Sequence, residues 1–146
     1  MLTLINDYRT NAGKSTLTYD YNLEKAAMQR AAELYVRFDT YRPTGKTYST
    51  LLQEYGFDVS PRKYFYGQLI MFADNGSLNT SESVFNRFTQ DSSMVDIIRG
   101  NFSSTAVGHV TIEKEDYWVV FFSSAPNNSS ATSPASGQQT VTVKIQ

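Results

Sequence analysis

Few side chains in this 146-residue chain are suited to acid–base or metal chemistry. The chain has no cysteine and a single histidine, His109, so disulfides, thiol catalysis and cysteine-bound zinc are excluded. His109 lies in the stretch AVGHVTI, which has the pattern of a strand. A catalytic base or metal site built on it would need carboxylates or carbonyl groups as its other members. We interpret His109 as a structural or surface residue.

The segment RFDTYRPTG, residues 37–45, occupies a place where functional groups are expected, between an apolar helical stretch and a turn. Pro43 fixes its own φ angle and Gly45 permits a positive φ, so residues 42–45 are expected to close a loop. An anion-binding turn at Arg42 is the alternative interpretation, and we favour the loop.

Aromatic residues make up 14% of the chain, and several gather in the stretch KYFYGQ, residues 63–68. This cluster predicts strand packing with hydroxyl groups at the edge, or else a groove for a glycan, a peptide or a lipid. We favour the packing. No Gly-x-Ser-x-Gly elbow, phosphate-binding loop or dinucleotide fingerprint is present.

The elements that must position these residues follow from periodicity. Apolar residues recur at helical spacing, with Asp20 as the N-cap of the longest helix and Asn79 with Glu82 as a capping box. The predicted helices cover residues 2–12, 20–38, 47–55, 80–90 and 93–99. Strands are predicted at 63–73, 105–112 and 117–123, the last two joined by the turn EKED. Helices first and a hairpin last indicate an α+β domain with helices packed on a sheet.

Composition divides the chain once. Residues 1–124 have the pattern of one folded domain. Residues 125–146 are rich in Ser, Asn and Pro and end in the alternating stretch TVTVKIQ, so we expect a linker with a possible terminal strand.

The bulk properties bear on partners and compartment. A net charge of -1 with a pI near 5.8 gives no electrostatic reason to expect binding to nucleic acid. No apolar run reaches the roughly 20 residues of a membrane span. The N-terminal residues also lack the pattern of a signal peptide. A secreted protein would therefore have lost its leader from this sequence.

The order of the motifs resembles the CAP superfamily, which comprises cysteine-rich secretory proteins, antigen 5 and pathogenesis-related proteins. The cysteine-free, SCP-like bacterial branch is the most similar. The motifs that carry the resemblance are LINDYRTNAG, LTYDYNLEKAAMQRAAEL, F-x-x-x-RP-x-G, YGQLIMFA, VFNRFTQDSSMVDIIRGNF, AVGHV and YWVVFFS. The resemblance spans almost all of residues 1–124 and implies an α-β-α sandwich with a central, mostly antiparallel sheet flanked by helices.

In that family a central cavity commonly holds two histidines and one or two acidic residues that bind a divalent metal. The resemblance places the first histidine at Thr40, the glutamate of the central strand at Gln68 and the second histidine at Met94. Asp91, three residues after Phe88, retains a carboxylate. Thr and Gln are neutral and Met is a soft ligand, so these positions predict no metal and no cofactor. Positions at a possible cavity rim are Tyr41, Arg42 and Tyr66.

The resemblance and the missing ligands together imply a non-catalytic binding or spacer module of a bacterial secreted or cell-surface protein. Its partner would be a wall polymer, a small apolar molecule or a protein. Two alternatives stay open. One is a hydrolase with an altered site that uses Asp91, His109 or a serine. The other is a purely structural domain in which Met94 and Phe88 fill the former cavity.

Overall fold

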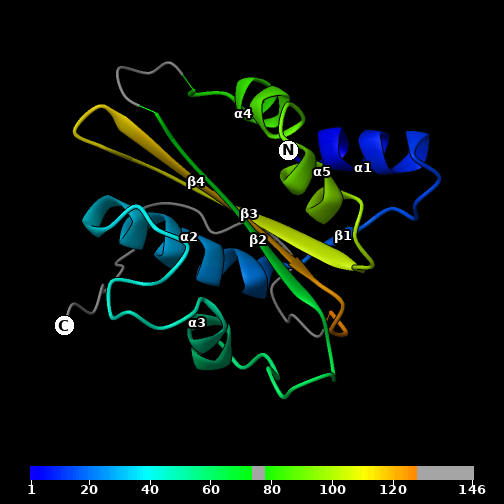
Figure 1. The fold of residues 1–146 in the computed structure, drawn as a ribbon, viewed down its shortest axis with the longest axis horizontal. Helices are drawn as coiled ribbons and strands as arrows, with labels where there is room; N and C mark the ends of the chain where they lie inside the picture. The colour runs from blue at the N-terminus through cyan, green and yellow to red at the C-terminus, as the bar shows by residue number, and fades with distance from the viewer. Residues whose placement is uncertain (74–77, 128–146) are drawn as a thin grey trace.

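The structure is a computed structural model that describes residues 1–73 and 78–127. The helices are α1 (Leu2–Asn11), α2 (Tyr21–Val36), α3 (Ser49–Glu54), α4 (Ser81–Phe88) and α5 (Ser92–Ile98). The strands are β1 (Thr18–Tyr19), β2 (Tyr66–Ala73), β3 (Ser104–Ile112) and β4 (Glu115–Ser123). Helices α2 and α3 lie on one side of the sheet, and α1, α4 and α5 lie on the other (Figure 1). This three-layer arrangement confirms the expected α+β sandwich.

Among the described residues, the strands form one sheet in the order β1-β3-β4-β2. Strand β1 is parallel to β3, whereas β3 pairs with β4 and β4 pairs with β2 in antiparallel fashion. The sheet is therefore mostly antiparallel, as expected. Strand β1 was not predicted, because two residues carry no periodic pattern. The hairpin turn is also shorter than the predicted EKED: Glu113 and Lys114 adopt positive φ angles, and β4 already begins at Glu115.

Each face of the sheet has its own apolar core. On the side of α1, α4 and α5, alternate residues of β2 and β4 meet residues of these helices, including Leu69, Trp118 and Phe88. On the side of α2 and α3, Val119 and Phe121 pack against the helices. Strand β4 is thus apolar on both faces, which explains its unbroken run of large hydrophobic residues.

Helix α2 lies directly against the sheet because small residues meet at the contact. A Cβ atom placed on Gly108 of β3 would lie 2.2 Å from the carbonyl oxygen of Ala27. Strand β3 therefore approaches the backbone of α2 closely at Ala27.

The helix caps agree with the sequence at one end of the domain and differ at another. Asp20 caps α2 as predicted and accepts hydrogen bonds from the backbone of Asn22 and Leu23. The capping box of α4 was predicted one residue too early, since Thr80 and Ser83 form it in place of Asn79 and Glu82. Thr80 is the last extended residue before the helix, and the hydroxyl of Ser83 takes the place of the expected glutamate.

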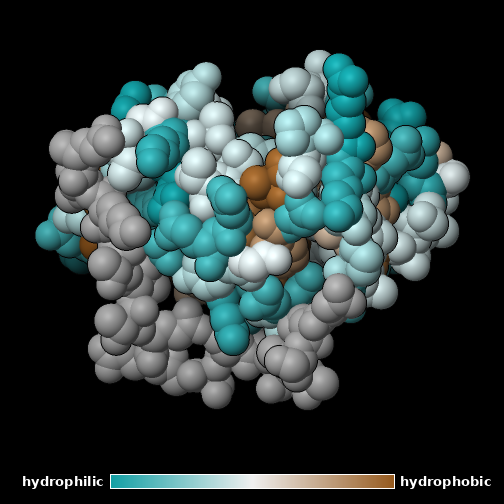
Figure 2. Space-filling model, turned by 90° about the horizontal axis from the view of Figure 1, so that it is seen from below, coloured by the Kyte–Doolittle hydropathy of each residue, from teal (hydrophilic) through white to brown (hydrophobic). Residues whose placement is uncertain are grey.

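The surface seen from the side of α3 is mostly hydrophilic, with a small hydrophobic area near its centre (Figure 2). Among the described residues, no helix combines the length and the apolar character needed to cross a bilayer. Residues 128–146, most of the predicted linker and its terminal strand, lie outside the described residues. The predicted boundary at residue 124 stays a prediction.

Candidate functional site

Arg30 lies between Thr40 and Gln68, two of the four positions at which the sequence places the family site. Its side chain is fully buried under α2, and its Nε atom donates a hydrogen bond of 2.7 Å to Oε1 of Gln68 on β2. Its Nη2 atom donates to the backbone carbonyl oxygens of Asp39 and Tyr41. One guanidinium therefore ties the helix to the edge strand and to the loop that carries Thr40.

Glu33 and Arg42 lie near this guanidinium, and Glu54 is linked to them through Arg42. Arg42 contacts Glu33 at 2.7 Å through Nη2 and Glu54 at 2.7 Å through Nη1. Nη1 of Arg30 lies 3.7 Å from Glu33. We call Arg30, Glu33, Arg42 and Glu54 the ionic cluster. Glu33 and Arg42 are 1% and 2% exposed, so their charges are balanced within the cluster and not by solvent.

The pKa values of the two buried arginines shift in opposite directions. It lowers the pKa of Arg30 to about 10, which still leaves the guanidinium charged at neutral pH. Burial also acts to lower the pKa of Arg42, but hydrogen bonds to Glu33 and Glu54 outweigh it and raise that pKa above its ordinary value. The cluster therefore carries two permanent positive charges beneath α2.

The structure brings two of the predicted site positions together. Nε2 of Gln68 donates a 3.3 Å hydrogen bond to the backbone carbonyl of Thr40. The Thr40 side chain itself is exposed, and its hydroxyl donates only to the neighbouring Asp39. Thr40 and Gln68 are therefore neighbours, and the guanidinium of Arg30 lies between them.

The other two predicted positions lie elsewhere. Asp91 is exposed and caps α5 by accepting hydrogen bonds from the backbone of Ser93 and Met94. A hydrogen bond from the Ser93 hydroxyl, together with these two backbone bonds, holds the pKa of Asp91 below its ordinary value. Met94 packs into the core on the side of α1, α4 and α5, whereas Gln68 faces α2. The sheet therefore separates Asp91 and Met94 from the Thr40–Gln68 pair.

The three positions expected at a cavity rim have different surroundings. Tyr41 is 50% exposed. Tyr66 is half-buried and donates its hydroxyl proton to the carbonyl oxygen of Asp58. Arg42, expected at a rim, is instead buried in the ionic cluster. The loop predicted for residues 42–45 is present, with Gly45 at a φ of 85° and its backbone N–H bonded to the Arg42 carbonyl.

These residues do not fit the divalent metal that the family resemblance implies. Around Gln68 the oxygen acceptors are neutral and already receive hydrogen bonds from a buried cation. A divalent ion there would face the charge of Arg30 at short range, and Asp91 is on the other side of the sheet. Within residues 1–73 and 78–127, no three His, Asp or Glu side chains are grouped to hold a metal ion.

His109 has a structural setting of its own on β3. Its Nε2 atom lies 2.7 Å from Oδ1 of buried Asp116, which also accepts a hydrogen bond from Thr111. Its ring stacks on Trp118 with a centroid distance of 3.8 Å and an interplanar angle of 6°. Among the described residues, no hydroxyl hydrogen-bonds to its second ring nitrogen, so a serine-type catalytic triad is not assembled there.

Sequence reasoning missed the ionic cluster, although one signal for it was present. Arg30 falls on the apolar face of the predicted helix, three residues before Glu33. A charged residue on a face that must be buried needs a partner, and the (i, i+3) spacing supplies Glu33 as one. The remaining partners, Arg42 and Gln68, come from a loop and a strand and required the fold.

Comparisons with known proteins agree with this architecture. The family model described as "CAP: Cysteine-rich secretory protein family" matches residues 2–123. A search of curated proteins found no match.

Two solved structures are similar to the whole described domain. An extracellular protein containing a SCP domain from Bacillus anthracis superposes with a TM-score of 0.66 at 13% identity, over 83% of this chain and 38% of that protein. An outer surface protein from Borrelia burgdorferi superposes with a TM-score of 0.66 at 16% identity, over 84% of this chain and 87% of that protein. At these identities the likeness is one of fold, and this chain spans well under half of the Bacillus protein.

Proposed function

Because this chain belongs to the family of cysteine-rich secretory proteins, we propose that it is a non-catalytic extracellular module that binds a partner or acts as a spacer. In this proposal the family's metal or catalytic site has been lost. The parent would be a bacterial secreted or surface protein, and the partner a wall polymer, a small apolar molecule or a protein.

The observation that carries the proposal is the guanidinium of Arg30. It lies between Gln68 and the loop of Thr40, the two positions where the family resemblance places a metal-binding glutamate and histidine. A group that is charged at neutral pH and fully buried repels a metal ion, and it offers no proton for general acid–base chemistry. The site is therefore occupied by a structural cation.

The extracellular part of the proposal has separate support. One similar structure is described as an extracellular protein and the other as an outer surface protein, both from bacteria. The absence of cysteine is compatible with a bacterial extracellular protein. A hydrolase that uses Asp91 would need a second catalytic group, but within the described residues the Asp91 carboxylate caps α5 and hydrogen-bonds only to Ser93 and Met94.

Calorimetric titration of the metal-free chain with zinc tests the loss of the site. We expect no heat of binding at micromolar zinc. Asp91→Ala is the test variant and Asp96→Ala is the matched control, since Asp96 is an exposed carboxylate on the same helix. Stoichiometric binding that Asp91→Ala abolishes and Asp96→Ala preserves would overturn the proposal.

A further inference from the structure

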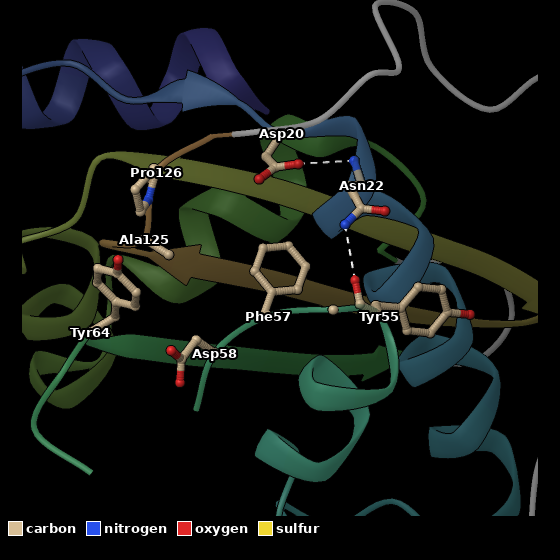
Figure 3. Close-up of a pocket in the computed structure, with 9 residues that line it drawn as sticks. Asp20, Asn22, Tyr55, Phe57, Asp58, Tyr64, Ala125 and Pro126 are labelled. Carbon is tan, nitrogen blue, oxygen red and sulfur yellow. Dashed lines mark hydrogen bonds between the residues drawn. The ribbon is translucent and has the colours of Figure 1, made fainter. Parts of the chain in front are cut away.

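An open pocket of about 370 Å³ lies at the N-terminal end of α2, at the opposite end of this helix from the ionic cluster. It forms where Asp20 and the first turn of α2 meet residues 55–58, Tyr64 and residues 125–126 (Figure 3). Its volume is at the small end of the range of about 300–1,000 Å³ that is usual for ligand pockets. None of the family-site positions lines it.

Asp20 supplies this pocket with an unused hydrogen-bond acceptor. The residue is only 1% exposed, and Oδ1 accepts the backbone N–H groups of Asn22 at 2.9 Å and Leu23 at 3.0 Å. Within the described residues, Oδ2 has no hydrogen-bond partner. Figure 3 shows this second oxygen turned toward the space bordered by Phe57, Tyr64 and Pro126. Because this oxygen faces the pocket, a ligand there that brings a hydrogen-bond donor can reach it.

The other walls of the pocket combine flat apolar surfaces with further polar side chains, among them Asn22, Asp58 and Tyr64. The rings of Phe57 and Tyr64 both line the space, as does the ring of Pro126. Phe57 is held in place by an edge-on contact with Tyr66, at a centroid distance of 6.3 Å. The Tyr64 hydroxyl has no hydrogen-bond partner within the described residues, so it is available to donate or accept.

The charges around the pocket are already balanced, which favours a neutral ligand over a cation. Asp58 is paired with Lys63 at 2.8 Å and accepts two further hydrogen bonds from Ser60. The charge of Asp20 is stabilised by two backbone N–H groups at the positive end of the α2 dipole. What Oδ2 lacks is a hydrogen-bond donor, and a hydroxyl group supplies one without adding charge.

We propose that this pocket binds one pyranose ring of a neutral saccharide, with Oδ2 of Asp20 accepting a hydrogen bond from a sugar hydroxyl. The C–H groups of the sugar ring lie against Phe57 and Tyr64, and the Tyr64 hydroxyl bonds a second hydroxyl. A single pyranose ring carries both kinds of group, apolar C–H faces and equatorial hydroxyls. The proposal goes beyond the module function, since it assigns the site and the chemical class of the partner.

The test is an NMR titration of the ¹⁵N-labelled chain with the methyl glycosides of glucose, galactose, mannose and N-acetylglucosamine, each at millimolar concentration. We expect at least one glycoside to shift the amide signals of Asn22 and Phe57. Asp20→Asn keeps an N-cap acceptor but removes the carboxylate, so it should weaken binding at least about tenfold, the effect of losing one hydrogen bond to a charged group. Tyr64→Phe tests the second contact without touching the cap.

Asp7→Asn is the matched control, because Asp7 is an exposed carboxylate on α1 across the sheet, and it should leave the affinity unchanged. The proposal is overturned if no glycoside shifts these signals, or if both pocket variants bind as the unaltered chain does. Stoichiometric zinc binding that Asp91→Ala abolishes and Asp96→Ala preserves would refute the loss of the family site and leave this assignment standing, so the two failures are distinguishable.

Discussion

The buried charged residues at the two ends of α2 have different surroundings. In the C-terminal half, Arg30 and Glu33 are sealed under the helix, and their partners Arg42 and Gln68 come from the same fold. At the N-terminal end, Asp20 is as deeply buried, but one of its carboxylate oxygens faces an open pocket. Removing one partner from the ionic cluster would leave a buried charge uncompensated, whereas the carboxylate oxygen that faces the pocket is open to a ligand.

The difference between the two ends of α2 indicates where to look for a functional site in this chain. Near Gln68, the guanidinium of Arg30 donates hydrogen bonds to the Gln68 side chain and to the backbone carbonyl of Asp39. The same helix positions a second, unrelated pocket at its other end. Each prediction below changes one of these two regions, the helix that holds both, or a reference group outside them.

The largest expected effect comes from opening the ionic cluster. Arg42→Met removes the main partner of Glu33 and leaves a buried carboxylate with only the more distant Arg30, so we expect a loss of about 3–5 kcal/mol in the free energy of unfolding. Urea denaturation measures it. The matched control is Arg37→Met, which breaks the exposed pair with Asp39 and should cost less than about 1 kcal/mol. Equal effects would show that the cluster contributes no more than a surface ion pair.

The second prediction concerns a substitution that displaces α2 from the sheet. Gly108→Ala places a methyl group 2.2 Å from the backbone oxygen of Ala27, which no side-chain rotation relieves. We expect a loss of about 1–3 kcal/mol or more in stability, together with amide shifts at both ends of α2. Chemical denaturation and a ¹⁵N correlation spectrum measure the two effects. Shifts confined to β3 would mean that α2 does not couple the two regions.

The third prediction separates the capping role of Asp20 from its proposed ligand role. Asp20→Ala removes both hydrogen bonds to the first turn of α2 and should cost about 0.5–2 kcal/mol in stability. Asp20→Asn retains an acceptor for these N–H groups and should stay close to the stability of the unaltered chain. Thermal unfolding monitored by circular dichroism compares the two. A full loss in the asparagine variant would mean that the carboxylate charge, not the cap geometry, stabilises the helix start.

The sequence predicted the order of the elements well because the patterns behind it are local. The helical stripe after Asp20 and the apolar run of β4 each read directly as an element, and the N-cap was identified from its residue type. The cluster around Arg30 could not be predicted in full, because Gln68 and Arg42 reach it only after the chain has folded. The pocket at Phe57 depends on long-range packing in the same way, and a pattern of neighbours along the chain does not contain it.

The smallest expected effect concerns Asp116, a buried carboxylate away from α2 that serves as a reference for both ends of that helix. Burial acts to raise its pKa, but hydrogen bonds from Thr111 and His109 outweigh burial and lower the pKa below its ordinary value. The stability that this group contributes is therefore fully present above the pKa of the unfolded chain, about 3.9, and is lost as the pH falls through the lower pKa of the folded state. Asp116→Asn should flatten the acid side of a plot of urea midpoint against pH. Asp7→Asn, which changes an exposed carboxylate on α1, should leave that slope nearly unchanged. If Asp116→Asn leaves the acid slope unchanged, the hydrogen bonds to Asp116 form equally well with the protonated carboxyl group. The charge of Asp116 would then contribute nothing to stability.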